Sequence, residues 1–304
     1  MKYKIINFLV PKLIRFFSYL PLSFMQALGW LIGFTLSFFP NQLVKIAERN
    51  IALCYPELSL LQQRKLVRQS VIQAVIAGAE MPAMFMKDPK KLMTYIKEYE
   101  NDDLLNQAFA QGKGLLCLGP HVGCWELGGL FLADRFPVFT LYTPPKQQVL
   151  SEIITKARAR SGAEMEPASQ SGVRHLFKAL KDKKAIAMLT DQVPDPDDFG
   201  GLYAPFFGID AWTMSFPSKL YSKRKPPTFI VYAIRRGVGR GFKLIVEPFD
   251  EHMKPFLSNS QCSDAFTYAM NKAYEKIAKK YSAQYQWTYR RFKHPPKGHP
   301  GLYL

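Results

Sequence analysis

The chain has 304 residues, enough to bury one large hydrophobic core, so we expect one main domain. It contains 41 lysines and arginines against 24 aspartates and glutamates, which gives a formal net charge of +17 at pH 7. A field of this sign and size favours a polyanionic partner: nucleic acid, an anionic lipid headgroup or an acidic carrier protein. Two basic clusters near aromatic residues are candidates for binding phosphate or a headgroup: Lys223-Arg224-Lys225 and Arg290-Arg291.

The cysteines and histidines exclude two kinds of site. The four cysteines form no Cys-x-x-Cys pair and no regular framework, so we expect reduced core residues and a cytosolic compartment for the folded part. The five histidines show neither a His-Glu-x-x-His motif nor a Cys/His spacing that would hold zinc. We therefore predict no metal site and no other cofactor. The cysteines are Cys54, Cys117, Cys124 and Cys262.

An uncharged N-terminal segment is the first predicted element. No charged residue lies between Arg15 and Lys45, and Pro21 and Pro40 bracket 18 residues that could just reach across a hydrocarbon core. We predict a membrane-associated helix in an anchor of residues 1–44, followed by a folded domain of residues 45–304. Basic residues flank the segment on both sides, so its orientation stays open, as expected for a tilted helix or one lying in the cytoplasmic leaflet. A buried core helix is the alternative, and the long apolar region disfavours a cleaved signal peptide.

The rest of the chain predicts an α/β fold. A capping-box pattern that begins at Ser59 opens a helix through Met81. From Leu115 onward, short apolar runs alternate with helical stretches, which is typical of a mixed sheet flanked by helices. The runs are Val138–Tyr142, Ala185–Leu189, Phe229–Ile234 and Lys243–Val246, and the helical stretches are Ser151–Arg160, Val173–Lys181, Thr213–Ser222 and Asp264–Tyr281.

The segment from Gly119 to Gly129 carries the strongest functional signal. It follows a short apolar run that fits a buried strand, so His121 is expected just past the carboxyl end, the edge of an α/β sheet where ligands bind. Glu126 is expected in the first turns of the next helix. An imidazole can take a proton from a hydroxyl, and a carboxylate behind it fixes the tautomer, so the two residues predict a general base. The alternative is a histidine that satisfies a strand end beside a surface glutamate.

Three further residues are candidates for substrate binding. Asp191 follows the apolar run that begins at Ala185, so we expect it at the same sheet edge as His121, facing one cleft; a turn or helix-cap role is the alternative. Arg158 and Arg160 end a predicted helix and point in different directions, so at most one is expected to reach the active site. We favour Arg160.

The Gly119–Gly129 segment resembles the H-x4-D/E block of membrane lysophospholipid acyltransferases, in particular the bacterial lipid A late acyltransferases, which use a glutamate. Further segments are similar to that family in the same order, and the resemblance runs from the N-terminal apolar segment to about Lys293. They are Arg158-Ala159-Arg160, Leu189-Thr190-Asp191-Gln192, Pro205-Phe206-Phe207-Gly208 and the stretch from Gln284 to Lys293.

The resemblance implies a glycerolipid acyltransferase-like fold, with residues 45–304 as the acyltransferase domain. It implies an enzyme at the cytoplasmic face of the bacterial inner membrane that moves a fatty acyl group from acyl carrier protein to a hydroxyl of an acylated lipid A precursor. His121, oriented by Glu126, would be the base, and no covalent acyl-enzyme is needed. Arg290 and Arg291 would bind phosphate on either substrate. Coenzyme A would suit the basic surface nearly as well as the carrier protein.

Other functions fit the sequence less well. The same motifs occur in acyltransferases for other glycolipids or lysophospholipids, such as phosphatidylinositol mannoside acyltransferases. A serine acyl-enzyme hydrolase is disfavoured because there is no G-x-S-x-G motif and the one S-x-x-K pattern, at Ser222, lies in a basic stretch. A basic membrane-tethered nucleic-acid-binding protein rests on charge alone, since no recognised fold of that class is present. We therefore expect no nucleic-acid partner.

Overall fold

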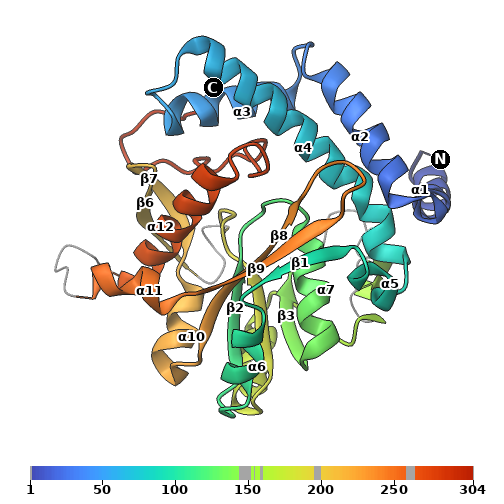
Figure 1. Ribbon diagram of the computed structural model, residues 1–304. Helices are drawn as coiled ribbons and strands as arrows, with labels where there is room; N and C mark the ends of the chain where they lie inside the picture. Colours follow the sequence, from blue (N-terminus) through green and yellow to red (C-terminus); the bar gives the residue numbers. More distant parts are fainter. Residues whose placement is uncertain are drawn as a thin grey trace.

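A seven-stranded sheet forms the centre of the molecule, with strands in the order β1-β9-β8-β2-β5-β3-β4 (Figure 1). The computed structural model describes residues 2–143, 152–153, 155–157, 160–194, 200–257 and 264–303, with side chains from residue 9 onward. The strands of this sheet are β1 (Ile96–Glu100), β2 (Leu115–Gly119), β3 (Val138–Tyr142), β4 (Glu164–Pro167), β5 (Ala185–Leu189), β8 (Thr228–Arg235) and β9 (Phe242–Pro248).

The sheet is mixed, as the alternation of strands and helices predicts. β2 is parallel to both of its neighbours, β5 and β8, and β3 is parallel to β5 and β4. β8 and β9 pair in antiparallel fashion, and β1 adds to β9 in parallel. All five residues of β2 are buried, which explains why this strand is an apolar run rather than an alternating one.

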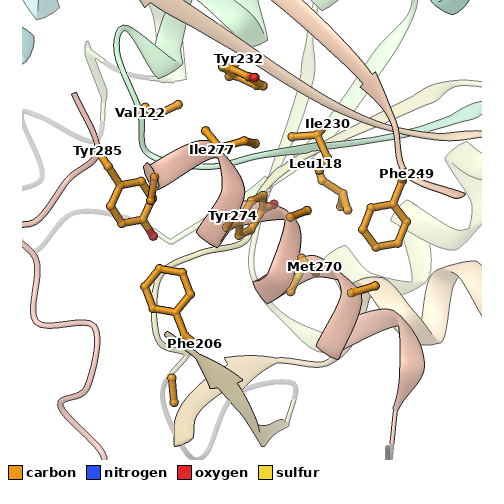
Figure 2. Packing of buried hydrophobic residues seen from close by; sticks show 14 of the residues in the cluster. Leu118, Val122, Phe206, Ile230, Tyr232, Phe249, Met270, Tyr274, Ile277 and Tyr285 are labelled. Carbon is orange, nitrogen blue, oxygen red and sulfur yellow. The ribbon is translucent and has the colours of Figure 1, made fainter. Parts of the chain in front are cut away.

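Hydrophobic cores lie on both faces of the sheet, because successive side chains of a strand point to opposite faces. Leu116 and Leu118 of β2 contribute to the larger core, whereas Leu115 and Cys117 contribute to the second. Figure 2 shows part of the larger core, in which Leu118 and Ile230 of the sheet lie among the side chains of the C-terminal helix and its neighbours. Labelled members from outside the sheet include Met270, Tyr274, Ile277 and Tyr285.

The helices cover both faces and one end of the sheet (Figure 1). A separate antiparallel pair, β6 (Gly201–Phe206) and β7 (Ile209–Met214), lies beside the C-terminal helix. The helices are α1 (Lys2–Tyr19), α2 (Leu22–Leu36), α3 (Gln42–Cys54), α4 (Leu60–Met86), α5 (Pro89–Met93), α6 (Asp103–Phe109), α7 (Trp125–Arg135), α9 (Gln170–Lys181), α10 (Phe216–Arg224), α11 (Asp250–Met253), the 3-10 turn η1 (Lys254–Phe256) and α12 (Ala265–Lys280).

The predicted apolar segment forms helix α2, which packs along α4. Two glycines one turn apart make the close approach possible: a Cβ at Gly29 would lie 2.9 Å from the Cα of Ile76, and one at Gly33 would lie 2.7 Å from the Cα of Ile72. With 15 residues, α2 is about 22 Å long, shorter than a hydrocarbon core of about 30 Å. In the described residues no single helix is long and apolar enough to cross a membrane, although residues 9–19 and α2 together, bent by 117°, satisfy the length and composition.

The face of α1 and α2 that turns away from α4 is apolar and exposed. The large side chains there include Trp30 at 43% exposure and Phe16 at 59%, far above the value expected for a helix that is buried on all sides. The layer of α1 and α2 is therefore buried on the side that packs against α4 and exposed on the other side. Its association with a membrane stays a prediction. The exposed apolar side chains of α1, α2 and the turn after α2 are Leu9, Leu13, Phe16, Tyr19, Phe24, Trp30, Leu31, Ile32, Phe34, Phe38 and Phe39; Leu60 and Leu61, in the first turn of α4, are exposed too.

Several predicted boundaries differ from the structure. α4 continues past Met81 to Met86, and α10 begins at Phe216 rather than Thr213 because residues 209–214 form β7. The aromatic alternation near Trp287 does not form a final strand: residues 284–293 are turns, with one isolated bridge from Tyr285 to Val122. The predicted helix at residues 151–160 lies partly outside the described residues.

The α2–α4 contact gives a stability prediction. Gly33→Ala should lower the melting temperature, because the new Cβ forces α2 away from the α4 backbone although alanine favours helix more than glycine does. Gly78→Ala is the matched control on the exposed face of α4, where an added Cβ meets nothing within 4 Å, and should leave stability unchanged or raise it by up to about 1 kcal/mol. Thermal unfolding in detergent measures both, and equal melting temperatures would contradict the packing.

Candidate active site

The register of two parallel strands brings His121 and Asp191 together. Gly119 ends β2 and pairs with Leu189, the last residue of β5, so the residues that follow both strands emerge at one sheet edge. Nδ1 of His121 lies 2.6 Å from Oδ1 of Asp191, and the backbone N–H of His121 donates to Oδ2 at 2.8 Å. One carboxylate therefore fixes both the ring and the backbone of the histidine. The two residues meet at the sheet edge where the sequence predicts them.

The charge state of Asp191 suits this role. Burial alone would raise the pKa of the Asp191 carboxyl, but the charge of His121, the two hydrogen bonds from it and the charge of Arg291 outweigh burial and hold that pKa below its usual value. A carboxylate that accepts from Nδ1 selects the tautomer with the proton on Nδ1. Nε2 is then the atom with a free lone pair, and it can act as a base.

Glu126 lies in the first turn of α7, where the sequence predicts it. It is buried and lines the same cavity as His121. In this structure the partner of Nδ1 is Asp191, so the predicted role of Glu126 in orienting the base stays a prediction. The ring of Trp125, which precedes it, packs against the imidazole, with ring centroids 5.2 Å apart.

The loop between β2 and α7 needs a glycine. Gly123 has φ +57°, and a Cβ there would lie 2.1 Å from the carbonyl oxygen of Ala233. The loop is held on two sides: the N–H of Cys124 donates to that carbonyl at 2.9 Å, and the N–H of Gly123 donates to the carbonyl of Gln284 at 3.1 Å. The backbone N–H of Gln286 donates to the carbonyl of His121 at 3.0 Å. The C-terminal segment thus supports the catalytic loop directly.

A buried ion pair also holds this loop. Arg235, at the end of β8, donates to both carboxylate oxygens of Glu80, at 2.8 and 2.6 Å, and to the carbonyl of Gly123 at 2.9 Å. Burial would lower the pKa of Arg235, but the charge of Glu80 and its hydrogen bonds outweigh that effect and raise it. Sequence reasoning missed this pair. Its signal was a glutamate inside the apolar stripe of α4, beside Ala77 and Ala83.

An apolar cavity of about 520 Å³ extends from His121 along α7. It lies over β2, β5 and β3 and continues from Trp125 at least as far as Leu132, about 10 Å along the helix. Its volume is typical of small-molecule sites, and its walls suit a hydrocarbon chain better than a polar ligand. The apolar lining includes Leu130, Leu132, Val138, Leu141, Ala187 and Val231.

Of the predicted arginines, Arg160, Arg290 and Arg291 do not line this cavity. Arg160 donates to the carbonyls of Phe85 and Met86 at the end of α4, and Arg158 lies outside the described residues. Arg290 is exposed, 6.0 Å from the ring centre of Tyr303.

Arg291 is buried, with 4% exposure. Its guanidinium donates to the carbonyl of Trp212 and to the side chains of Thr213 and Asn271, at 2.8 to 3.1 Å. In this structure the Arg291 side chain joins the β6–β7 pair to α12, and its predicted phosphate contact stays a prediction. Among the described residues that line the cavity, the cation is Lys293, which sequence reasoning did not single out.

Nothing in the described residues provides a metal site or an activated thiol. No group of three or more His, Cys, Asp or Glu side chains there could hold a metal ion, and the expected absence of a metal stays a prediction. Cys54, Cys117 and Cys124 are buried free thiols, and Cys262 lies outside the described residues. Burial raises the pKa of the Cys117 thiol to about 12 and that of Cys124 well above its usual value, so neither is a ready nucleophile.

A histidine held by a carboxylate beside a hydrocarbon-sized cavity is an arrangement that suits an enzyme acting on acyl chains. The sequence profile of the family described as "Bacterial lipid A biosynthesis acyltransferase" matches residues 1–294. The chain therefore belongs to this family and is an acyltransferase.

Characterised proteins of similar sequence agree with this assignment. The chain is 26% identical over 286 residues to the lipid A biosynthesis palmitoleoyltransferase of Escherichia coli (strain K12). The matched region covers 94% of this chain and 90% of that protein. It is 26% identical over 285 residues to the lipid A biosynthesis lauroyltransferase of the same organism, covering 93% and 90%. A lipid A biosynthesis acyltransferase of Haemophilus influenzae is 25% identical over 273 residues, covering 85% and 80%.

The Asp191–His121 contact predicts a pH-dependent stability. Because the pKa of Asp191 is lower in the folded state than its ordinary value of 3.8, its contribution is fully present above that value and is lost as the pH falls through the folded pKa. Urea unfolding of the wild type and Asp191→Asn should therefore show a stability difference at about pH 5 that shrinks toward about pH 3. A difference that is constant over this range would contradict the ionised contact.

Proposed function

We propose that the protein transfers a fatty acyl group from acyl carrier protein to a hydroxyl of an acylated lipid A precursor, at the cytoplasmic face of the bacterial inner membrane. The observation that carries the proposal is the apolar cavity that begins at His121, since it offers space for a hydrocarbon chain beside a base. The names of the similar enzymes support lipid A as the acceptor class.

In the proposed reaction the His121 Nε2 atom removes the proton of the acceptor hydroxyl. The oxygen attacks the thioester carbonyl carbon, the new ester C–O bond forms, and the C–S bond breaks. The thiolate that leaves takes the proton back from the imidazolium, so the histidine is regenerated and no acyl-enzyme forms. Backbone N–H groups or an arginine would hold the oxyanion.

Glu126 is the proposed second carboxylate of the base. It lies in the same cavity as His121, five residues further along the chain, and its negative charge favours the imidazolium that forms during transfer. Asp191 acts from the other side, through Nδ1. The proposed base therefore uses two carboxylates: Asp191 positions the histidine, and Glu126 acts from the cavity that the substrate enters.

Phosphate on either substrate is proposed to meet the C-terminal segment. Lys293 lines the cavity and Arg290 is exposed nearby in the chain, so both can present a positive charge at the mouth. Arg160 and Arg158 remain proposed substrate contacts; for Arg160 this requires release from the α4 carbonyls that it binds here. Arg291 also remains a proposed phosphate contact, and this requires release from the β7 and α12 groups that it binds here.

The exposed apolar side chains of α1, α2 and the first turn of α4 are proposed to lie in the membrane interface. Their side chains form one half-buried layer, and aromatic residues such as Trp30, Phe34 and Phe38 suit the boundary between headgroups and acyl chains. This arrangement would hold the active site beside its lipid acceptor. Acylation of another glycolipid or a lysophospholipid uses the same chemistry, and mass spectrometry of lipid A with and without the gene separates the two.

Substitution of the base tests the mechanism. His121→Ala and Glu126→Ala should each lower kcat by about 10² or more with little change in folding, because both serve one proton transfer, and the double variant should lose little more than either single one. Steady-state kinetics with a lipid A precursor and thermal unfolding of each variant measure these effects. A folded His121→Ala protein with near wild-type turnover would exclude His121 as the base.

A further inference from the structure

A basic surface groove runs beside the active site, between α9 and α10. Val173 and Phe177 of α9 form one side of the groove, and Phe216 and Lys223 of α10 form the other. Phe177 and Phe216 meet edge to face, with ring centroids 6.1 Å apart, and Nζ of Lys223 lies 4.7 Å from the ring centre of Phe177. Phe216 also lines the active-site cavity, so one residue separates the groove from the site.

The two helices that form this groove carry charges of one sign. Neither α9 nor α10 contains an aspartate or a glutamate, and both end in basic residues. In the part of the chain that the structure describes, the carboxylates close to the two helices include Glu166, which pairs with His175, Asp182 at the end of α9, and Asp250, whose charge acts on Tyr221 of α10. The cations on the two helices are Arg174, Lys178, Lys181, Lys219, Lys223 and Arg224, all of them exposed.

The position of the groove favours a partner from the aqueous side. Figure 1 shows α10 at the opposite end of the molecule from α1 and α2, whose exposed apolar side chains are the proposed membrane surface. A lipid headgroup that belongs to the same membrane would not reach α10. An apolar strip edged by cations, open to solvent, instead matches an acidic amphipathic helix: its apolar side covers Phe177 while its carboxylates pair with the lysines.

We infer that the α9–α10 groove docks the acidic acyl carrier protein, with the thioester arm entering the cavity past Phe216. This inference rests on the proposed function, because it assigns a surface to the proposed donor. Lys178 and Lys223, one on each helix, provide the central charges. The contact is electrostatic, so it should speed association and set the apparent affinity for the donor rather than the chemical step.

The test is a charge reversal on both helices. Lys178→Glu/Lys223→Glu should raise the apparent KM for acyl carrier protein by about tenfold or more, with little change in kcat. The KM for a short acyl-pantetheine thioester, which does not need the groove, should stay within about twofold of wild type. Raised salt should weaken carrier use by the wild type more than by the variant, because the variant has lost the attraction that salt screens.

The control carries the same change of charge elsewhere. Lys90→Glu/Lys91→Glu lies on α5, where both lysines are exposed, and should leave the carrier KM near the wild-type value. Equal effects of the two double variants would overturn the docking site, since they would report only the net charge of the protein. An equal rise in KM for the small thioester would also overturn it, since the site itself would then be disturbed.

Two further outcomes separate the docking site from the proposed function. If the wild type uses acyl-pantetheine but not acyl carrier protein, the proposed donor is wrong. The docking of that donor in the α9–α10 groove is then wrong as well. If the variant keeps its carrier KM but loses binding to phosphatidylglycerol vesicles, the groove binds lipid and the inference is wrong. A selective rise in carrier KM, absent from the α5 control, supports docking on α9 and α10.

Discussion

The contact between His121 and Asp191 is the interaction on which the site depends. It exists because β2 and β5 are parallel neighbours in exact register, so that the second residue after each strand faces the other. The Asp191 carboxylate accepts the ring N–H and the backbone N–H of His121, and therefore fixes the side chain and its loop together. With Nδ1 occupied, Nε2 is the ring atom left to take a proton in the proposed reaction.

A second network connects this loop to the N-terminal helices. Gln26 of α2 donates to Glu80 at 2.7 Å and accepts from the N–H of Gly239 at 2.8 Å, while Glu80 holds Arg235 and Arg235 holds the carbonyl of Gly123. Removing one member of such a buried ion pair leaves an uncompensated charge and costs about 3–5 kcal/mol. The apolar layer that is proposed to meet the membrane is therefore built into the fold of the active site, rather than attached through a flexible linker.

Sequence patterns predicted those parts of the structure that depend on local order. β3 and β5 have the predicted bounds, because each is a short apolar run that ends at polar or turn residues. His121 and Asp191 could be placed at one edge because parallel strands share their carboxyl ends. The helix before Pro21 was missed: the apolar segment forms α2, and α1 precedes it at a bend of 117°.

Long-range pairing explains the rest of what the sequence did not show. Arg291 was expected to bind phosphate, but its partners come from β7 and α12, which no local pattern connects to it. The β6–β7 hairpin turns at Phe207 and Gly208, with φ +52° and +76°; the glycine favours such a turn, but the phenylalanine before it does not. The carboxylate at Nδ1 is likewise 70 residues away along the chain. The five-residue spacing from His121 to Glu126 is visible in the sequence. The contact from His121 to Asp191 forms only because β2 and β5 pair in the sheet.

The tautomer of His121 tests this account most directly. Nitrogen-15 NMR of the protein labelled at histidine distinguishes a protonated ring nitrogen from one with a free lone pair, and His121→Gln identifies the signal. The account predicts that neutral His121 carries its proton on Nδ1, and that Asp191→Asn weakens this preference and lowers kcat together. A proton on Nε2 in the neutral wild type would contradict it, because the atom that faces the substrate could not then act as the base.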